Sequence, residues 1–121
     1  MIKIFKIIFF TLLSFIFIHA IVIGEEEKIK IGLLVPMTGD DKDLGQLIIK
    51  STRMALQDIG NDKIEIYPKD TSSDPDKALN SALELKRLGI RIIIGPIFFK
   101  SLSYLDDVED VVFLSLTNKT M

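Results

Sequence analysis

From residue 29 onward, the spacing of apolar residues changes repeatedly between a strand-like and a helix-like repeat. The resulting order alternates strands and helices, beginning and ending on a strand, with short connections. This order is typical of an α/β fold, in which a parallel sheet carries helices on both faces and the crossovers are right-handed. We expect the strands across the sheet in the order second, first, third, fourth. The expected strands are residues 29–36, 63–67, 90–94 and 111–116, and the expected helices are 43–59, 75–88 and 101–108.

Local signals set the ends of several elements. Asp74 is the expected cap of the second helix, because its side chain can accept from free N–H groups and Pro75 follows with a preset φ angle. Asp43 is the expected cap of the first helix, and Pro68 is expected to end the second strand. The branched aliphatic residues of 90–94 indicate a strand buried on both faces. An apolar stripe on the first helix consists of Leu44, Leu47, Ile48, Ala55 and Ile59.

The N-terminal segment has the order of a secretory signal peptide. Lys3 and Lys6 precede an apolar run, and the run ends before the acidic residues 25–27. We therefore expect a signal peptide at 1–24, a linker at 25–28, and a partial N-terminal lobe of a larger protein at 29–121. An uncleaved inner-membrane anchor is the alternative, although cleavage is favoured. Either way, the body would be exported to the periplasm, because the positive end of the leader stays inside.

Composition excludes several functions for the body. Without residues 1–24, two of the 15 basic side chains are lost and none of the 17 acidic ones, which leaves a formal charge near −4. Such a chain is a poor nucleic-acid binder. The chain has no cysteine, and its single histidine, His19, lies in the leader. With no activated nucleophile, no metal-ligand cluster and no glycine-rich cofactor motif, we expect neither an enzyme, nor a metal site, nor a cofactor.

Any ligand crevice should lie at the carboxyl ends of the parallel strands. The candidate contacts there are Thr38, Asp70, Thr71, Phe98, Phe99, Ser115 and Thr117. Two alternatives remain open. The polar residues 70–72 could hold a ligand or could satisfy their own turn, and the turn is favoured. The two phenylalanines could line the crevice or pack under the next helix.

The segment from Ile31 to Gly39 (Ile-Gly-Leu-Leu-Val-Pro-Met-Thr-Gly) resembles the opening of the type I periplasmic binding proteins, the Leu/Ile/Val-binding superfamily. Asp70-Thr71, Ser73-Asp74-Pro75 and Ile93-Ile94-Gly95-Pro96 are similar to later landmarks of the family, in the same order. The resemblance implies two α/β lobes that close on a ligand. This chain would supply only the first four strands of the first lobe, as an N-terminal fragment.

The segment after Gly95-Pro96 differs between the branches of this superfamily. The resemblance implies a polar, serine-rich segment there in amino-acid binders, whereas this chain has Ile97-Phe98-Phe99-Lys100, and its first serine, Ser101, comes only afterwards. Together with residues 113–118, this segment is similar to the penicillin-binding protein activators, which stimulate peptidoglycan synthases. The implied partner is then a peptidoglycan synthase. The alternative is the receptor of an ABC importer for branched-chain amino acids or a related small solute, with an ABC permease as partner.

Overall fold

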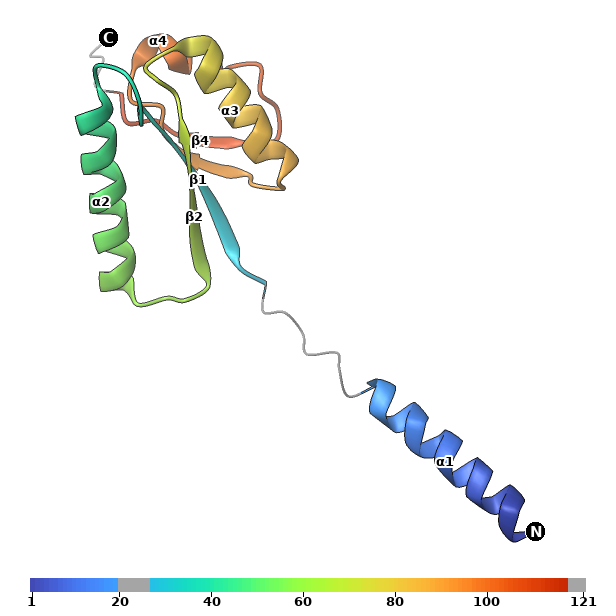
Figure 1. Cartoon of the computed structure of the whole chain (residues 1–121). Coiled ribbons are helices and arrows are strands. Elements are labelled where there is room, and N and C mark those ends of the chain that lie inside the picture. Colours follow the sequence, from blue (N-terminus) through green and yellow to red (C-terminus); the bar gives the residue numbers. More distant parts are fainter. Residues whose placement is uncertain (20–26, 118–121) are drawn as a thin grey trace.

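The computed structural model describes residues 1–19 and 27–117 (Figure 1). The region in which we expect leader cleavage, residues 20–26, lies outside the described residues. An apolar helix, α1 (Ile2–His19), forms the N-terminal segment and is considered apart from the body. The described residues contain no helix that is both long enough and apolar enough to cross a membrane. The elements of the body are β1 (Ile29–Val35), α2 (Lys42–Ile59), β2 (Ile64–Asp70), α3 (Pro75–Arg87), β3 (Ile92–Ile94), α4 (Phe99–Leu102) and β4 (Val112–Leu114).

The four strands form one parallel sheet in the order β2-β1-β3-β4, which confirms the expected order and the α/β class. Helix α2 lies on one face and helices α3 and α4 on the other (Figure 1). The α3 face holds the larger buried cluster, whereas Leu33 and Val35 of β1, which point to the other face, are also fully buried. On the α3 face, Leu34 and Ile93 from the sheet are fully buried against Leu85 of α3. Helix α3 approaches β1 so closely that a Cβ atom on Gly32 would lie 2.6 Å from the Leu85 side chain.

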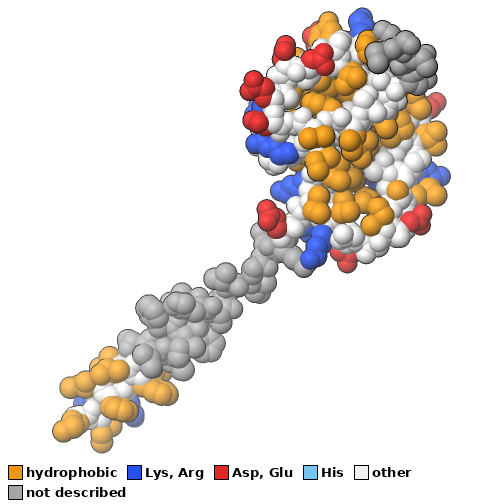
Figure 2. All heavy atoms as spheres, turned by 180° about the vertical axis from the view of Figure 1, so that it is seen from behind, with side chains coloured by type: hydrophobic (Ala, Val, Ile, Leu, Met, Phe, Trp, Pro, Cys, Tyr) orange, Lys and Arg blue, Asp and Glu red, His pale blue; other side chains and the backbone are white. Residues whose placement is uncertain are grey.

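The other face of the sheet is only partly covered. Since Ile93 and Phe113 face the core, Ile92, Val112 and Leu114 point the opposite way, and they are 39%, 59% and 52% exposed. Figure 2, the view from behind, shows hydrophobic side chains gathered across the body. The prediction that the third strand is buried on both faces is therefore wrong, because only the α3 side of β3 is packed.

Several element ends also differ from the expectation. Helix α2 begins at Lys42, so Asp43 is not its cap; Asp41 precedes the helix and makes no side-chain capping bond. Pro68 lies inside β2, where it pairs with Leu33. Proline is tolerated there because β2 is an edge strand, with one row of backbone groups facing away from the sheet. Helix α4 ends at Leu102 and turns follow it, so the expected helix 101–108 is largely absent.

The apolar stripe of α2 is poorly buried. Leu47 and Ile59 are 60% and 61% exposed, and Gly45 is the buried residue of this helix. By contrast, the start of α3 follows the prediction closely. The Asp74 carboxylate accepts from the backbone N–H of Lys77 at 2.8 Å, and Pro75 is the first helical residue.

Candidate functional site

One carboxylate ties together the ends of β1 and β2, at the edge of the sheet where the sequence predicts a crevice. The Oδ1 atom of Asp70 accepts from the backbone N–H groups of Met37 at 2.7 Å, Thr38 at 3.2 Å and Ser72 at 2.8 Å. Its Oδ2 atom accepts from the Thr38 hydroxyl at 2.6 Å, the Lys77 ammonium at 2.8 Å and the Ser72 hydroxyl at 3.0 Å. The carboxylate of Asp70 is therefore already fully engaged by the protein itself.

These contacts decide the charge of Asp70. Partial burial raises the pKa of its carboxyl, but the Lys77 ammonium, the Thr38 hydroxyl and the N–H groups of Met37 and Ser72 together outweigh burial. They hold the pKa of Asp70 well below its usual range, so the group is ionised at neutral pH. Its negative charge is balanced locally by Lys77, and the group has little left to offer a ligand.

The turns around Asp70 are fixed by further bonds. The Thr38 and Ser72 hydroxyls lie 2.6 Å apart, and the Lys77 ammonium donates to the Ser72 hydroxyl at 2.6 Å. The Ser73 hydroxyl donates to the Asp41 carboxylate at 2.6 Å. Ser72 and Ser73 both adopt positive φ angles, of 46° and 57°. Such backbone is sparsely populated by residues other than glycine and requires support from its surroundings. The turn after β1 and the turn after β2 thus form one rigid unit.

A second group of candidate residues follows β3 and β4. The Gly95 N–H donates to the Leu114 carbonyl at 2.9 Å, and the Leu116 N–H donates to the Pro96 carbonyl at 3.1 Å. These two bonds extend the parallel pairing and place the segment after Pro96 beside the segment after Leu114. The Gly95–Pro96 peptide bond is cis.

The side chains of this second group differ in their access to solvent. Phe98 is half-buried, whereas Phe99, at the start of α4, is 45% exposed. The Ser115 hydroxyl bonds the Thr117 hydroxyl at 3.1 Å and accepts from the Thr117 N–H at 3.2 Å. The exposed surface here therefore includes the ring of Phe99, the neighbouring charged side chain of Lys100, the Ser115 hydroxyl and the side chain of Leu116.

The seven candidate residues all lie at the carboxyl ends of the strands, and the hydrogen bonds gather them into two groups. Thr38 and Asp70 join the first, and Ser115 and Thr117 join the second. Thr71 is only 3% exposed, and its backbone N–H donates to the Val35 carbonyl at 3.0 Å, so it belongs to the packing. Whether any of them contacts a ligand remains a prediction.

Sequence reasoning placed Ser72 in the turn of residues 70–72 but missed Lys77 as a member of the first group. One signal could have found Lys77. It lies in the first turn of α3, which begins beside the end of β2, so a lysine there can reach the last residue of that strand. Within residues 1–19 and 27–117, no group of three histidine, cysteine or acidic residues could hold a metal ion.

Comparison with known protein families shows which family the chain belongs to. Residues 28–119 match the family model described as periplasmic binding protein. The chain belongs to the periplasmic binding protein family. This match covers nearly all of the body. A comparison with curated proteins found no match.

Solved structures of this family resemble the chain over most of its length. The leucine-binding protein LivK of Thermotoga maritima has a TM-score of 0.68 at 19% identity, over 75% of this chain, which shows the shared fold. A solute-binding protein of an ABC transporter from Rhodopseudomonas palustris, in complex with 3,4-dihydroxybenzoic acid, has a TM-score of 0.64 at 27% identity over 69% of the chain. LpoA of Haemophilus influenzae has a TM-score of 0.63 at 27% identity over 76% of the chain.

The periplasmic binding protein chain described here spans only part of each of these proteins. It covers 28% of LivK, 24% of the Rhodopseudomonas protein and 17% of full-length LpoA. The C-domain of LpoA, described as a regulator of PBP1A, is 28% identical over 74% of this chain, which covers 28% of that domain. The similar structures thus include both a solute-binding protein of an ABC transporter and a regulator of PBP1A.

Proposed function

We propose that the chain is part of an exported, non-enzymatic protein that activates a peptidoglycan synthase by direct contact. The observation that carries this proposal is the segment after Pro96. Where amino-acid binders of the superfamily have polar residues, this chain has Phe98 and Phe99, and the ring of Phe99 is 45% exposed. An exposed aromatic ring beside hydroxyl groups suits a protein contact, because aromatic residues are enriched at the centres of protein interfaces.

The state of Asp70 supports the same proposal. Asp70 is the acidic residue among the seven candidate contacts, so in a receptor for a free amino acid it would be the candidate for the ligand's amine. The Asp70 carboxylate accepts six hydrogen bonds from within the protein, and Lys77 neutralises it. The likeness to the LpoA C-domain, 28% identical and a regulator of PBP1A, points in the same direction.

A second function is favoured by one observation. A solute-binding protein of an ABC transporter from Rhodopseudomonas palustris is 27% identical over 69% of this chain, about the same identity as LpoA. The chain would then be part of the receptor of an ABC importer for a branched-chain amino acid or a related small solute, with an ABC permease as partner. In that case Thr38, Ser115 and Thr117 would contact the ligand.

The first test measures binding to a peptidoglycan synthase from the same cells by biolayer interferometry, together with the rate of glycan-chain synthesis. We expect the chain to bind and to raise the rate. Phe99→Ser should weaken binding by about tenfold or more, since loss of an interface aromatic commonly costs over 1 kcal/mol. Tyr104→Ser is the matched control, because Tyr104 is 44% exposed but lies outside the proposed contact. Equal loss in both variants, or no binding, would contradict the activator proposal.

The second test separates the importer alternative. Thermal unfolding would be measured with leucine, isoleucine or 3,4-dihydroxybenzoate added. A ligand at 100 times its Kd should stabilise the folded protein by about 2.7 kcal/mol. A rise in Tm with one of these ligands, together with no binding to the synthase, would favour the importer receptor.

A further inference from the structure

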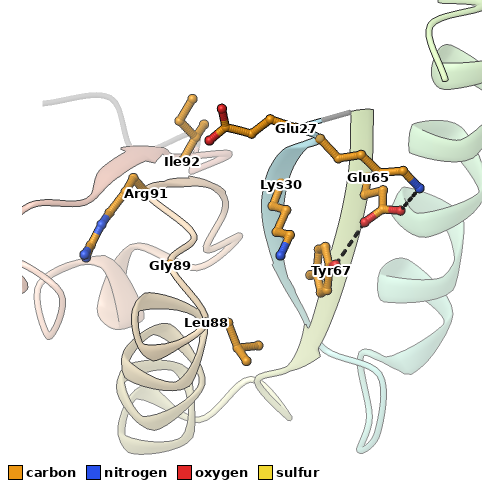
Figure 3. Close-up of a pocket in the computed structure, with 9 residues that line it drawn as sticks. Glu27, Lys30, Glu65, Tyr67, Leu88, Gly89, Arg91 and Ile92 are labelled. Atoms are coloured by element: carbon orange, nitrogen blue, oxygen red, sulfur yellow. Dashed lines mark hydrogen bonds and ion pairs between the residues drawn. The ribbon is translucent and has the colours of Figure 1, made fainter. Parts of the chain in front are cut away.

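A hollow of about 800 Å³ lies at the opposite end of the sheet, where the strands begin (Figure 3). Lys28 and Lys30 of the β1 segment and Glu65 and Tyr67 of β2 form one side. Leu88, at the end of α3, and Arg91, just before β3, form the other. This site is separate from the candidate crevice, so an inference about it does not depend on the proposed function.

The register of the sheet brings two cations side by side in this hollow. Ile31 pairs with Ile92, so the preceding residues, Lys30 and Arg91, are lateral neighbours on adjacent parallel strands. Both point to the α3 face, because Leu34 and Ile93, at even spacing from them, belong to the core on that face. Adjacent strands lie about 4.8 Å apart, so the two residues start from neighbouring backbone positions, and in Figure 3 the Arg91 side chain extends away from that of Lys30.

The acidic residues around the hollow do not pair with these two cations. Glu65 forms an ion pair with Lys28, and its other oxygen accepts from the Tyr67 hydroxyl at 3.0 Å. The pKa of Glu65 is lowered chiefly by its bond to Lys28 and then by Tyr67, with only a smaller influence of Lys30. In Figure 3, the Glu27 carboxylate lies at the rim beside Ile92. Among the described residues, neither the Lys30 ammonium nor the Arg91 guanidinium forms an ion pair.

We propose that this hollow binds a phosphate group between Lys30 and Arg91. A phosphate monoester carries a charge of about −1.5 to −2 near neutral pH, and the phosphodiester of a lipid headgroup carries about −1, so either would offset positive charge of Lys30 and Arg91. The guanidinium of Arg91 can donate two parallel hydrogen bonds to phosphate oxygens, and the Lys30 ammonium adds a third. The Tyr67 ring and the Leu88 side chain, which is 54% exposed, provide an apolar surface for the remainder of the ligand. The phosphate could belong to a soluble compound or to a phospholipid headgroup.

The test uses the full chain and inorganic phosphate as the probe. Binding is followed by NMR shifts of backbone amides at constant ionic strength, because exposed charges are screened by salt. The test variant is Lys30→Gln/Arg91→Gln. The matched control is Lys50→Gln/Arg53→Gln, which removes the same two charges from exposed positions on α2. Far-ultraviolet circular dichroism verifies that each variant is folded, and Lys30→Arg/Arg91→Lys, which keeps both charges, serves as a rescue.

We expect saturable shifts at residues around Lys30 and Arg91 in the wild type, the control and the rescue variant. The Gln/Gln test variant should bind at least about tenfold more weakly, which corresponds to about 1.4 kcal/mol. A second arm measures sedimentation with phosphatidylglycerol vesicles. One outcome is that the wild type binds the vesicles but not inorganic phosphate. If vesicle binding is then lost in the test variant and kept in the control, the phosphate belongs to a lipid headgroup. Equal binding by test and control variants in both arms, or no wild-type binding in either, would overturn the proposal.

Discussion

Replacing Asp70 by asparagine should lower the free energy of unfolding by about 2–3 kcal/mol, since hydrogen bonds to a charged group contribute about 1.5–3 kcal/mol. The substitution preserves size, so it opens no cavity. It keeps one oxygen that can accept from the Met37 and Ser72 N–H groups, but it removes the charge that faces the Lys77 ammonium at 2.8 Å. It also places an NH₂ donor among existing donors. Because Lys77 is 48% exposed, the ion pair itself contributes only up to about 1 kcal/mol.

The pH dependence follows from the direction of the pKa shift. The pKa of Asp70 is lower in the folded protein than the usual value of about 3.9 in unfolded chains. Its ionised form therefore contributes stability that is fully present above about pH 5 and is lost as the pH falls. For one such group, linkage gives a loss of about 1.3 kcal/mol by pH 3. Asparagine cannot titrate. The difference in free energy of unfolding between the wild type and Asp70→Asn should therefore be smaller at pH 3 than at pH 7 by that amount.

Urea denaturation followed by circular dichroism at pH 7 and pH 3 would measure both effects. Asp106→Asn is the control, because Asp106 is exposed and outside the Asp70 cluster, and it should change stability by less than about 0.5 kcal/mol. The reasoning would be refuted by an Asp70→Asn variant as stable as the control at pH 7. An equal difference in free energy of unfolding between the wild type and Asp70→Asn at both pH values would refute the assignment of the low pKa.

The remaining predictions concern three other parts of the chain. In Gly45→Ala, the new Cβ would lie 1.7 Å from the Pro36 carbonyl oxygen, so alanine should destabilise by about 1–3 kcal/mol despite its higher helix propensity. In the same urea assay, Ser51→Ala on that helix should change stability by less than about 0.5 kcal/mol; a stabilised Gly45→Ala would contradict the contact. Export in a bacterial host should create a new N-terminus within residues 21–25, detectable by mass spectrometry of the periplasmic fraction, and an intact first methionine on soluble cytoplasmic protein would argue against it. A body of residues 25–121 should associate through the open edge at β4, giving species larger than a monomer in light scattering; a sharp, thermally cooperative monomer would show this to be wrong.

The parts of the fold that the sequence predicted depend on short-range chemistry. The cap at Asp74 with Pro75 needs only neighbouring residues, and the structure has that cap. The parallel pairing follows from short crossovers between strands, and the expected strand order was also correct. The position of the seven candidate residues followed from topology in the same way.

The predictions from sequence fail where tertiary contacts, and not local sequence, determine the structure. Pro68 is a strand terminator by local rules, yet β2 continues through it because an edge strand has a free side. Burial of both faces of β3 was inferred from its apolar residues, although the exposed face of Ile92 has no helix above it. The engagement of Asp70 was foreseen only as turn chemistry. Its bond to Lys77 joins two elements, so it could have been expected only once the start of α3 had been placed beside the end of β2.

The thin packing of α2 bears on how the molecule would unfold. The buried cluster lies between the sheet and the α3 and α4 segments, whereas α2 buries Gly45 and leaves most of its other residues in solvent. Cooperativity is therefore unevenly distributed. In native-state hydrogen exchange, amides in the middle of β1 and in α3 should exchange only when the whole domain unfolds. Amides of α2 should exchange through a separate local opening that has a lower free energy. Helix α2 would then behave as an independent unit of unfolding.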